Sequence, residues 1–182
     1  MTMFCHFVDE NIHLEPSHPY YAEPLFALTD QNREFLKKWL PWLDGVTSVD
    51  HSRDFLQQQL QNYADGTGLS LLIFYRKELA GIIGFNSINP NNQTGEIGYW
   101  LGEKFNDRGI MTKCVRELIR FGSQYYGLQK VVIRCSTGNE KSRKIPQGLG
   151  FLKEGTLRRA ENLYGEWHDH DVYALLSEDF FG

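Results

Sequence analysis

The residue types best suited to chemistry in this sequence lie between positions 96 and 171. Positions 101 to 112 read Leu-Gly-Glu-Lys-Phe-Asn-Asp-Arg-Gly-Ile-Met-Thr, where a strand is expected to end and a long helix to begin. The first amides of a helix have no intrahelical partners and lie at the positive end of its dipole, so they attract anions, above all phosphate. Arg108 adds positive charge, and Gly109 lets the backbone approach an anion closely. The sequence therefore indicates a phosphate site, although such joins are also common without one.

A second polar cluster is His168-Asp169-His170-Asp171. Its two histidines would share one face of a strand, which can suit a metal ion. No third strong ligand accompanies them, so we expect no metal. A solvated strand face is the favoured interpretation, and one structural His or Asp beside a substrate is the alternative. The sequence also contains no Ser-His-Asp order, no Walker loop and no glycine fingerprint for a dinucleotide.

Hydrophobic spacing and turn signals predict the elements that position these residues. The expected strands cover residues 12–15, 69–75, 79–88, 94–101, 130–135, 152–163 and 167–176. The expected helices cover residues 20–39, 50–63, 108–126 and 139–149, with Asp50 as an N-cap and Gly127 as a C-terminal stop. This order predicts an α/β (α+β) fold with a mixed sheet of about seven strands, about four helices and a parallel crossing between the fourth and fifth strands.

Length and composition exclude several classes of protein. The 182 residues correspond to one domain, residues 1–182, and 41% of them are hydrophobic, which is enough for a core. A net charge of −4 is unusual for a nucleic-acid binder. The apolar run at 69–75 is far shorter than the roughly 20 residues that span a bilayer, and no signal peptide is visible. Cys5, Cys114 and Cys135 form no disulfide or zinc pattern, so we expect a cytoplasmic protein without membrane or nucleic-acid partners.

Several motifs, spread over nearly the whole chain, resemble one known family. They are Glu96-Ile-Gly-Tyr-Trp-Leu101, Arg108-Gly-Ile-Met-Thr112, Asn139-Glu-Lys-Ser142 and Gly150-Phe151, with Trp39-Leu-Pro-Trp42 early and Asp171-Val-Tyr173 late. Together they are similar to the GCN5-related N-acetyltransferase (GNAT) family, and most similar to its RimJ/RimL-type ribosomal-protein N-terminal acetyltransferases. The resemblance implies a GNAT fold with a splay between strands 4 and 5, and acetyl-CoA as the co-substrate.

The resemblance also implies which residues hold the cofactor. The strand end would offer backbone groups to the acetyl carbonyl and the pantetheine arm, and the loop and helix start would hold the pyrophosphate. The implied cofactor-binding residues are Trp100, Leu101, Asn106, Arg108, Gly109, Ile110, Met111, Thr112, Asn139 and Ser142.

In RimL-like members, a Glu in the strand after Gly-Phe acts as the base and a Ser after the Asn acts as the acid. Glu161 and Ser142 occupy these positions. Outside the resemblance, Glu161 is equally an exposed carboxylate at a strand end, and Ser142 a first-turn residue bonded to its own backbone. The candidate residues for the acceptor pocket are Trp39, Trp42, Asn86 and Tyr164, of which the two tryptophans are equally well read as aromatic core.

The sequence departs from the family pattern at three positions. Met111 replaces the last small residue of the loop, and Asp107 adds a carboxylate beside the expected phosphate site. Pro146 stands where the wider family often has a Tyr that protonates the leaving thiolate. Since Pro cannot donate a proton, another residue must serve, or the thiolate leaves unassisted.

The resemblance implies acetyl transfer to a primary amine, most readily the N-terminal α-amine of a (ribosomal) protein, by a homodimer. A small-molecule amine as acceptor, or a non-catalytic acyl-CoA-binding module, are the alternatives. The charge distribution agrees with a polyanionic cofactor, because residues 104–159 hold 13 basic and 4 acidic residues, a net charge of +9. The rest of the chain carries −13, which suits a cationic amine.

Overall fold

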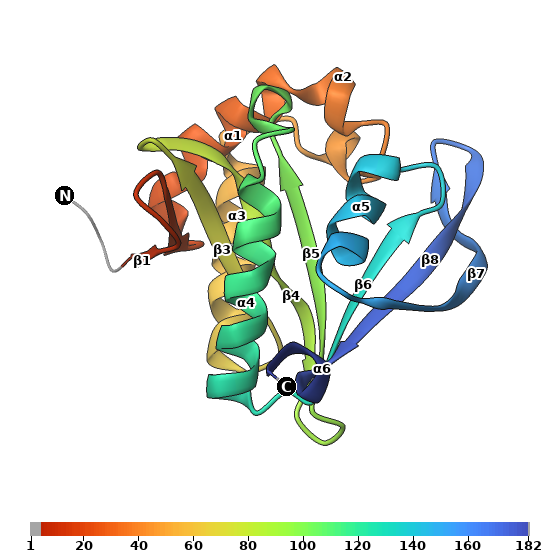
Figure 1. Cartoon of the computed structure of the whole chain (residues 1–182). Coiled ribbons are helices and arrows are strands. Elements are labelled where there is room, and N and C mark those ends of the chain that lie inside the picture. The colour runs from red at the N-terminus through yellow and green to blue at the C-terminus, as the bar shows by residue number, and fades with distance from the viewer. Residues whose placement is uncertain (1–4, 182) are drawn as a thin grey trace.

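The structure, a computed structural model, describes residues 5–181 (Figure 1). Its strands are β1 (His6–Phe7), β2 (Ile12–Pro16), β3 (Leu69–Tyr75), β4 (Glu78–Asn89), β5 (Thr94–Leu101), β6 (Lys130–Ser136), β7 (Leu152–Leu163) and β8 (Glu166–Leu176). Its α-helices are α1 (Ala22–Gln31), α2 (Arg33–Leu36), α3 (Val49–Ala64), α4 (Ile110–Tyr126), α5 (Glu140–Gly148) and α6 (Ser177–Phe181). Short 3-10 helices cover Pro19–Tyr21, Leu43–Gly45 and Glu103–Phe105.

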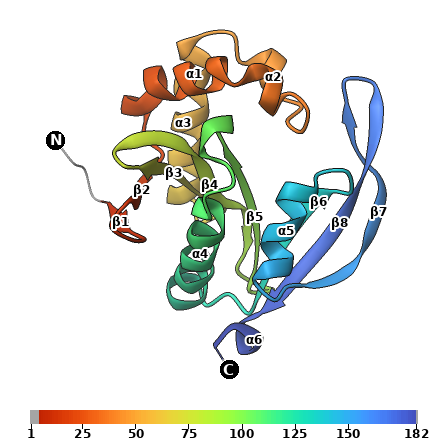
Figure 2. The same ribbon diagram turned by 45° about the horizontal axis from the view of Figure 1, so that its top comes forward.

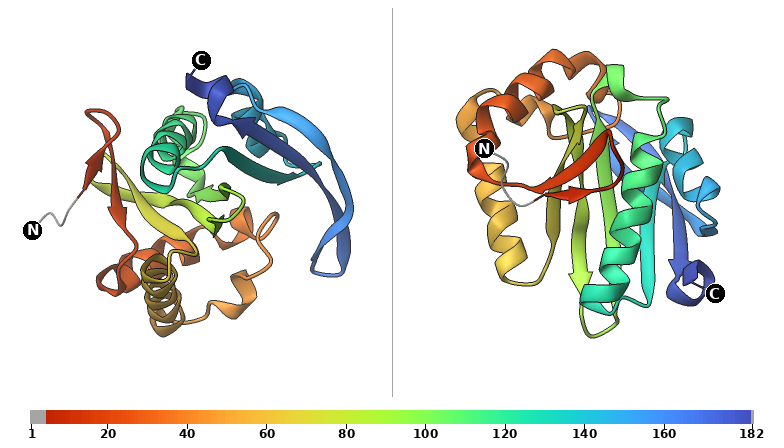
Figure 3. Two further views of the ribbon diagram at one scale, coloured as in Figure 1. Left: turned by 90° about the horizontal axis from the view of Figure 1, so that it is seen from below. Right: turned by 60° about the vertical axis from the view of Figure 1, so that its left-hand side comes forward.

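Within the described residues, the eight strands form one sheet in the order β1-β2-β3-β4-β5-β6-β8-β7. Helices α4 and α5 cover one face, and α1 and α3 cover the other (Figure 3). The mixed α/β class is therefore confirmed, and the two-residue strand β1 accounts for the additional strand. No helix among residues 5–181 combines the length and the apolar character needed to cross a membrane.

The sheet opens between β5 and β6. Strand β5 pairs with β4 along its whole length, from Asn89↔Thr94 to Gly81↔Leu101. It pairs in parallel with β6 only from Thr94↔Lys130 to Ile97↔Ile133, and beyond these residues the two strands diverge (Figure 1). The predicted parallel crossing and the predicted splay are both confirmed.

Helix α4 begins beside this opening because of Gly109. Gly109 has φ +71° and is the N-cap of α4, in the left-handed region that glycine adopts without steric cost. The apolar stripe of the helix is buried against the sheet: Ile110, Met111, Cys114, Val115, Leu118 and Ile119. Burial of this stripe fixes the direction in which the first amides of α4 point.

Two predicted helices differ in detail from the structure. The helix expected at 20–39 is divided after α1, because the Asn32 side chain donates to the Leu28 carbonyl and accepts from the Glu103 amide. Asp50 is not the N-cap of α3. Ser48 has that role, with an extended backbone and a side chain that accepts from the His51 amide, and Asp50 lies in the first turn.

The β7–β8 hairpin projects beyond the rest of the sheet (Figure 2). Its register shifts between the pairs Leu157↔His170 and Glu161↔His168, so three residues of β7 oppose one residue of β8. Arg159, within this bulge, has φ +49°, and its amide donates to Asp169. A bulge bends its strand and changes where the following side chains point. Here it precedes Glu161 directly.

The base of the hairpin is held by a buried carboxylate. The Asp171 side chain is 1% exposed, and Lys153 Nζ and Arg143 Nη2 lie 2.6 and 3.0 Å from its oxygens. The Thr156 hydroxyl donates to it over 2.7 Å. Burial alone would raise the pKa of Asp171, but the hydrogen bonds from Lys153 and Thr156 and the charge of Arg143 hold that pKa below its usual range.

We predict that Asp171→Asn lowers the free energy of unfolding at pH 7 by about 3 kcal/mol, since it leaves two cations beside a neutral buried group. A depressed pKa in the folded state stabilises the protein above the unfolded pKa, and this contribution is lost as pH falls through the folded value. The difference between wild type and variant in urea melts should therefore shrink below about pH 4. Glu154→Gln, which removes an exposed pair with Lys130, is the control and should cost about 1 kcal/mol or less. A difference that stays constant down to pH 3 would contradict the assignment.

Candidate functional site

A cavity of about 840 Å³ lies at the opening between β5 and β6. Its walls come from the segment after α2, from β4 and β5, from the start of α4, from β6 and α5, and from the β7–β8 hairpin. The predicted site residues that line it are Trp39, Trp42, Asn86, Trp100, Leu101, Asn106, Met111, Asn139, Ser142 and Glu161. The divergence of two neighbouring strands thus brings together residues that are more than 100 positions apart.

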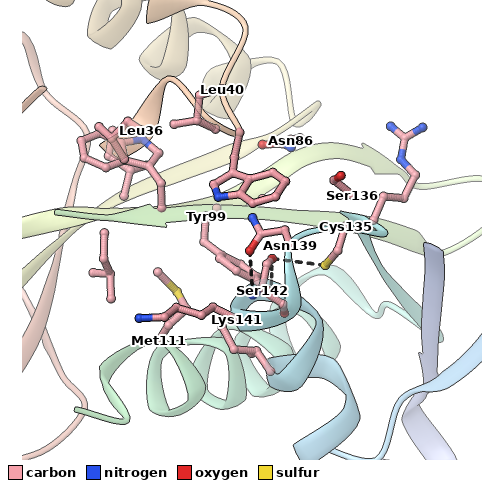
Figure 4. A pocket seen from close by; sticks show the side chains of 18 of the residues that line it. Leu36, Leu40, Asn86, Tyr99, Met111, Cys135, Ser136, Asn139, Lys141 and Ser142 are labelled. Carbon is pink, nitrogen blue, oxygen red and sulfur yellow. Dashed lines mark hydrogen bonds between the residues drawn. The ribbon is translucent and has the colours of Figure 1, made fainter. Parts of the chain in front are cut away.

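On the α5 side, the cavity contains a chain of four polar groups (Figure 4). Asn139 caps α5, and its Oδ1 accepts from the Ser142 amide over 3.1 Å. Ser142 Oγ lies 3.3 Å from the Tyr99 hydroxyl and 3.2 Å from Cys135 Sγ. The Tyr99 hydroxyl in turn donates to the Ser142 carbonyl over 3.1 Å. The Ser142 hydroxyl is therefore fixed between a phenol and a thiol at the wall of the cavity.

This chain of groups is held in its neutral form. Burial raises the pKa of the Tyr99 hydroxyl well above its ordinary value. Burial also raises the pKa of the Cys135 thiol, against the opposing effect of its contacts with Ser142 and Tyr99. A neutral hydroxyl can donate a hydrogen bond to an anion, whereas a thiol that keeps its proton is a poor nucleophile. The arrangement therefore suits stabilisation of a negative charge and not covalent catalysis by Cys135.

The predicted phosphate loop is only partly in contact with the cavity. Asn106 and Met111 line it, while Ile110 is buried in the core at 1% exposure. Arg108, Gly109 and Thr112 are not among the described residues that line it, and Arg108 Nε donates to the Lys104 carbonyl over 3.1 Å. Since the Arg108 side chain is engaged elsewhere, the backbone amides at the start of α4, next to Met111, are the groups of this loop that can bind an anion.

Asp107 lies in this loop with φ +62°, and its carboxylate points to Lys141 on α5. The two side chains are 2.7 Å apart and both are largely exposed. Lys141 thus neutralises the carboxylate that seemed unfavourable beside a phosphate site.

On the other side of the sheet, aromatic residues wall the cavity. The Trp42 and Trp100 rings lie 6.1 Å apart, and the Trp39 ring lies 6.5 Å edge-on from His168. Trp42 is 40% exposed, so it is a wall and not part of the core. Tyr164 is not among the described residues that line the cavity, because its hydroxyl donates to the Leu40 carbonyl from the hairpin tip. This contact connects the hairpin tip to the aromatic segment after α2, residues 39–42.

Asn86 occupies a space that only glycine leaves open. A Cβ atom built on Gly98 would lie 2.3 Å from the Asn86 side chain, closer than any real Cβ contact. Gly98 is the first residue of β5 beyond the last pair with β6. The missing side chain therefore admits the Asn86 amide to the cavity where the strands diverge.

Glu161 reaches the cavity from β7 and lies beside His170 of β8. Glu161 Oε2 is 3.3 Å from His170 Nε2, and the two side chains are 27% and 16% exposed. Nearby, Arg134 of β6 donates to Glu96 of β5 over 2.7 and 2.9 Å, and this ion pair links the two strands where their backbone pairing ends. No group of three His, Cys, Asp or Glu in residues 5–181 could hold a metal ion.

Tyr99, Cys135 and His170 contribute polar groups to the cavity and were not among the predicted site residues. Tyr99 is part of the motif of β5 and alternates with Trp100, so the strand period could have assigned it to the opposite face. Cys135 was considered only for disulfides and metals. His170 was read with His168 as a solvated face, with one structural His or Asp of this cluster beside a substrate as the alternative. Only the pairing of β8 between β6 and β7 brings His170 next to Glu161.

Comparison with known proteins agrees with this geometry. The family described as Acetyltransferase (GNAT) domain matches residues 11–152. The ribosomal-protein-serine acetyltransferase of Escherichia coli is 34% identical over 169 residues, which cover 93% of this chain and 94% of that protein.

Two solved structures are also similar. RimL, a ribosomal α-N-protein acetyltransferase in complex with coenzyme A, superposes with a TM-score of 0.93 at 30% identity over 97% of this chain and 99% of that one. MccE, a microcin self-immunity acetyltransferase in complex with acetyl-CoA and AMP, superposes with a TM-score of 0.89 at 34% identity over 93% and 94% of the two chains.

The cavity chemistry makes a prediction for the three cysteines, all of which are free thiols. Burial raises the pKa of Cys114 to about 12, and that of Cys135 is also raised. Because the thiolate is the reactive form, Cys114 should react with iodoacetamide at pH 8 about 100-fold or more slowly than the half-exposed Cys5, and Cys135 should also react more slowly than Cys5. Mass spectrometry of peptides from timed reactions measures the three rates, with protein unfolded in guanidinium as the control. Alkylation of folded Cys135 as fast as Cys5 would show that its thiol is ionised and accessible.

Proposed function

The chain belongs to the GNAT family and is an acetyl-CoA-dependent N-acetyltransferase, and we propose that its acceptor is the N-terminal α-amine of a ribosomal protein. The observation that carries this proposal is that one cavity is lined both by Ser142 and by Glu161. These are the positions of the acid and the base in the RimL-like pattern. The similarity to a ribosomal-protein-serine acetyltransferase supports a protein N-terminus as the acceptor.

The residues at the opening suit coenzyme A. Past Ile97, the backbone groups of β5 that face β6 have no strand partner and can bind the amide-rich pantetheine arm. The first amides of α4 suit the pyrophosphate, and the basic segment 104–159 raises the local concentration of a polyanion. Acetyl-CoA supplies the acetyl group as a thioester. We propose that Trp100, Leu101, Asn106, Met111 and Asn139 contact it, and that Arg108, Gly109, Ile110 and Thr112 act through the backbone and charge of the loop.

The proposed reaction is direct attack of a neutral amine on the thioester carbonyl. A C–N bond forms, the C–S bond breaks, and the amine loses one proton to Glu161. An N-terminal α-amine has a pKa of roughly 7.7–8.0, so about a tenth of it is neutral at pH 7 and a carboxylate suffices as the base. A lysine side chain, with a pKa of about 10.4, would require a stronger base. This difference favours an α-amine as the acceptor.

Ser142 is the proposed donor to the departing thiolate. Its hydroxyl has one proton, which it donates to the Tyr99 hydroxyl over 3.3 Å and can turn toward the sulfur when the thiolate forms, while the Tyr99 hydroxyl stays bound to the Ser142 carbonyl. In the wider family, a tyrosine at the position of Pro146 often protonates the leaving thiolate. Here Tyr99 holds the Ser142 hydroxyl in place for that step. Burial of both groups strengthens these hydrogen bonds, because the local dielectric is low.

We further propose that residues 1–182 work as one acetyltransferase domain, as a homodimer in the cytoplasm. The continuous sheet from β1 to β7 supports one domain. The three free thiols suit a reducing compartment. The homodimer rests on the resemblance to RimL-type enzymes.

A small-molecule amine is the second candidate acceptor. The similarity to MccE, whose structure holds AMP beside acetyl-CoA, favours it, and so do the broad aromatic walls of Trp39, Trp42 and Trp100. A non-catalytic acyl-CoA-binding module is disfavoured, because such a module has no use for Glu161 beside the cavity.

The first prediction for function is the identity of the acceptor. With acetyl-CoA at pH 7, we expect acetylation of a peptide with a free N-terminal serine, and roughly 100-fold less acetylation of the same peptide with a blocked N-terminus and a free lysine. Intact-mass spectrometry measures both, alongside a polyamine, an amino acid and an aminoglycoside. Faster turnover of a small amine would favour the second candidate.

Acetyl-CoA at 100 times its dissociation constant should add about 2.7 kcal/mol to the free energy of unfolding, and the absence of a thermal shift would contradict both candidates.

The second prediction concerns the base. Glu161→Gln should lower kcat for an N-terminal amine by about 100-fold at pH 7. The deficit should become smaller above pH 8, where most of the amine is neutral without help. Initial rates from pH 6 to 9 measure this, with Glu166→Gln, an exposed residue of the same hairpin, as the control. A Glu161→Gln rate equal to wild type across this range would remove Glu161 as the base.

A further inference from the structure

We propose that His170 is a positioning residue, which donates from Nε2 to the Glu161 carboxylate and holds it toward the acceptor amine. This proposal rests on the assignment of Glu161 as the base. It gives a purpose to a partly buried titratable group that the reaction, as described above, does not use.

The backbone brings the two residues together at one place. The bulge of β7 ends at Glu161, which pairs with His168, while His170 pairs with Leu157 at the other end of the bulge. On the other side of β8, His170 pairs with Ser136 of β6. His170 therefore lies at the centre of three strands, and only the irregular stretch of β7 lets the Glu161 side chain reach it.

The polar atom of His170 that faces Glu161 is otherwise unsatisfied. Nε2 is buried and makes no hydrogen bond to any described residue, although Glu161 Oε2 is only 3.3 Å away. A buried polar atom without a partner costs about 1–3 kcal/mol. Catalytic hydrogen bonds are often long before substrate binds and shorten in the complex. A small approach of Glu161 when the amine arrives would satisfy Nε2 at the moment when the carboxylate is needed.

The other charged groups near this point are already engaged. Arg134 donates to Glu96, and Asp169 accepts from the Arg159 amide. Asp171, the next residue along β8, binds Lys153 and Arg143. His168 lies beside Ser136 and the Trp39 ring, with its Nδ1 3.5 Å from the Ser136 hydroxyl. Among the described residues that line the cavity, His170 is therefore the donor that lies beside Glu161.

The two oxygens of the Glu161 carboxylate have separate roles in this proposal. Glu161 has two oxygens; once the carboxylate approaches Nε2, Oε2 accepts from His170, and Oε1 stays available to take the proton of the attacking amine. His170 keeps its own proton throughout, so it acts on the orientation of Glu161 and not as a relay. An amide of similar reach, as in glutamine, should be able to replace it.

The test compares His170→Gln with His170→Ala in steady-state assays with an N-terminal serine peptide. His170→Ala should lower kcat by about 10- to 100-fold, the effect of a misplaced catalytic group, with KM for acetyl-CoA unchanged. His170→Gln should keep kcat within about threefold of wild type, because its side-chain NH₂ can donate to Glu161. Thermal melts and acetyl-CoA titrations verify that both variants fold and bind.

A double-mutant cycle separates this proposal from the assignment of the base. If Glu161 is the base and His170 acts through it, His170→Ala in the Glu161→Gln background should cause no further loss of kcat. Equal losses for His170→Gln and His170→Ala, no loss for either, or additive losses with Glu161→Gln would each overturn the positioning role. If Glu161→Gln alone retains full activity, it is the assignment of Glu161 that fails.

Discussion

The end of the pairing between β5 and β6 is the constraint on which the rest of the structure depends. After Ile97 and Ile133 the strands diverge, and the sheet has an opening in its middle instead of a continuous ladder. Unpaired backbone groups are costly when they are buried, so the opening is stable only where a ligand, water or side chains satisfy them. The extended arm of coenzyme A offers such groups. The same divergence joins the two faces of the sheet, so an amine from one side can meet a thioester from the other.

Contacts on both faces of the sheet hold the elements around the opening in place. On one face, the buried stripe of α4 fixes the start of that helix, and the ion pair of Lys141 with Asp107 connects the loop before α4 to α5. On the other, the aromatic segment after α2 lies against the hairpin through the Tyr164 contact with Leu40. Between them, the Arg134–Glu96 pair links β6 to β5 at the end of their backbone pairing.

The sequence predicted the elements well where one physical signal dominated. The continuous apolar run of β3 and the helical stripe of α4, closed by Gly127, left few alternatives. It predicted less well where a contact distant in sequence decides the outcome: Asn32 ends α1 because Glu103 lies beside it. The unpredicted cavity residues have the same cause. Tyr99, Cys135 and His170 belong to three different strands, and only the order of the sheet, with β8 between β6 and β7, brings them to one cavity.

The two ends of the cavity differ in a way that matches the charges of acetyl transfer. The thiolate end is lined by Ser142, Tyr99 and Cys135, whose neutral hydroxyl and thiol groups can donate to a developing negative charge without carrying charge themselves. The amine end is lined by the Glu161 carboxylate, whose negative charge suits a cationic amine and whose oxygens can take a proton in the proposed reaction. A cation at the thiolate end would stabilise the thiolate more strongly but would also oppose the arriving ammonium. Neutral donors at one end and a carboxylate at the other avoid this conflict, so both partners can be bound before the reaction begins.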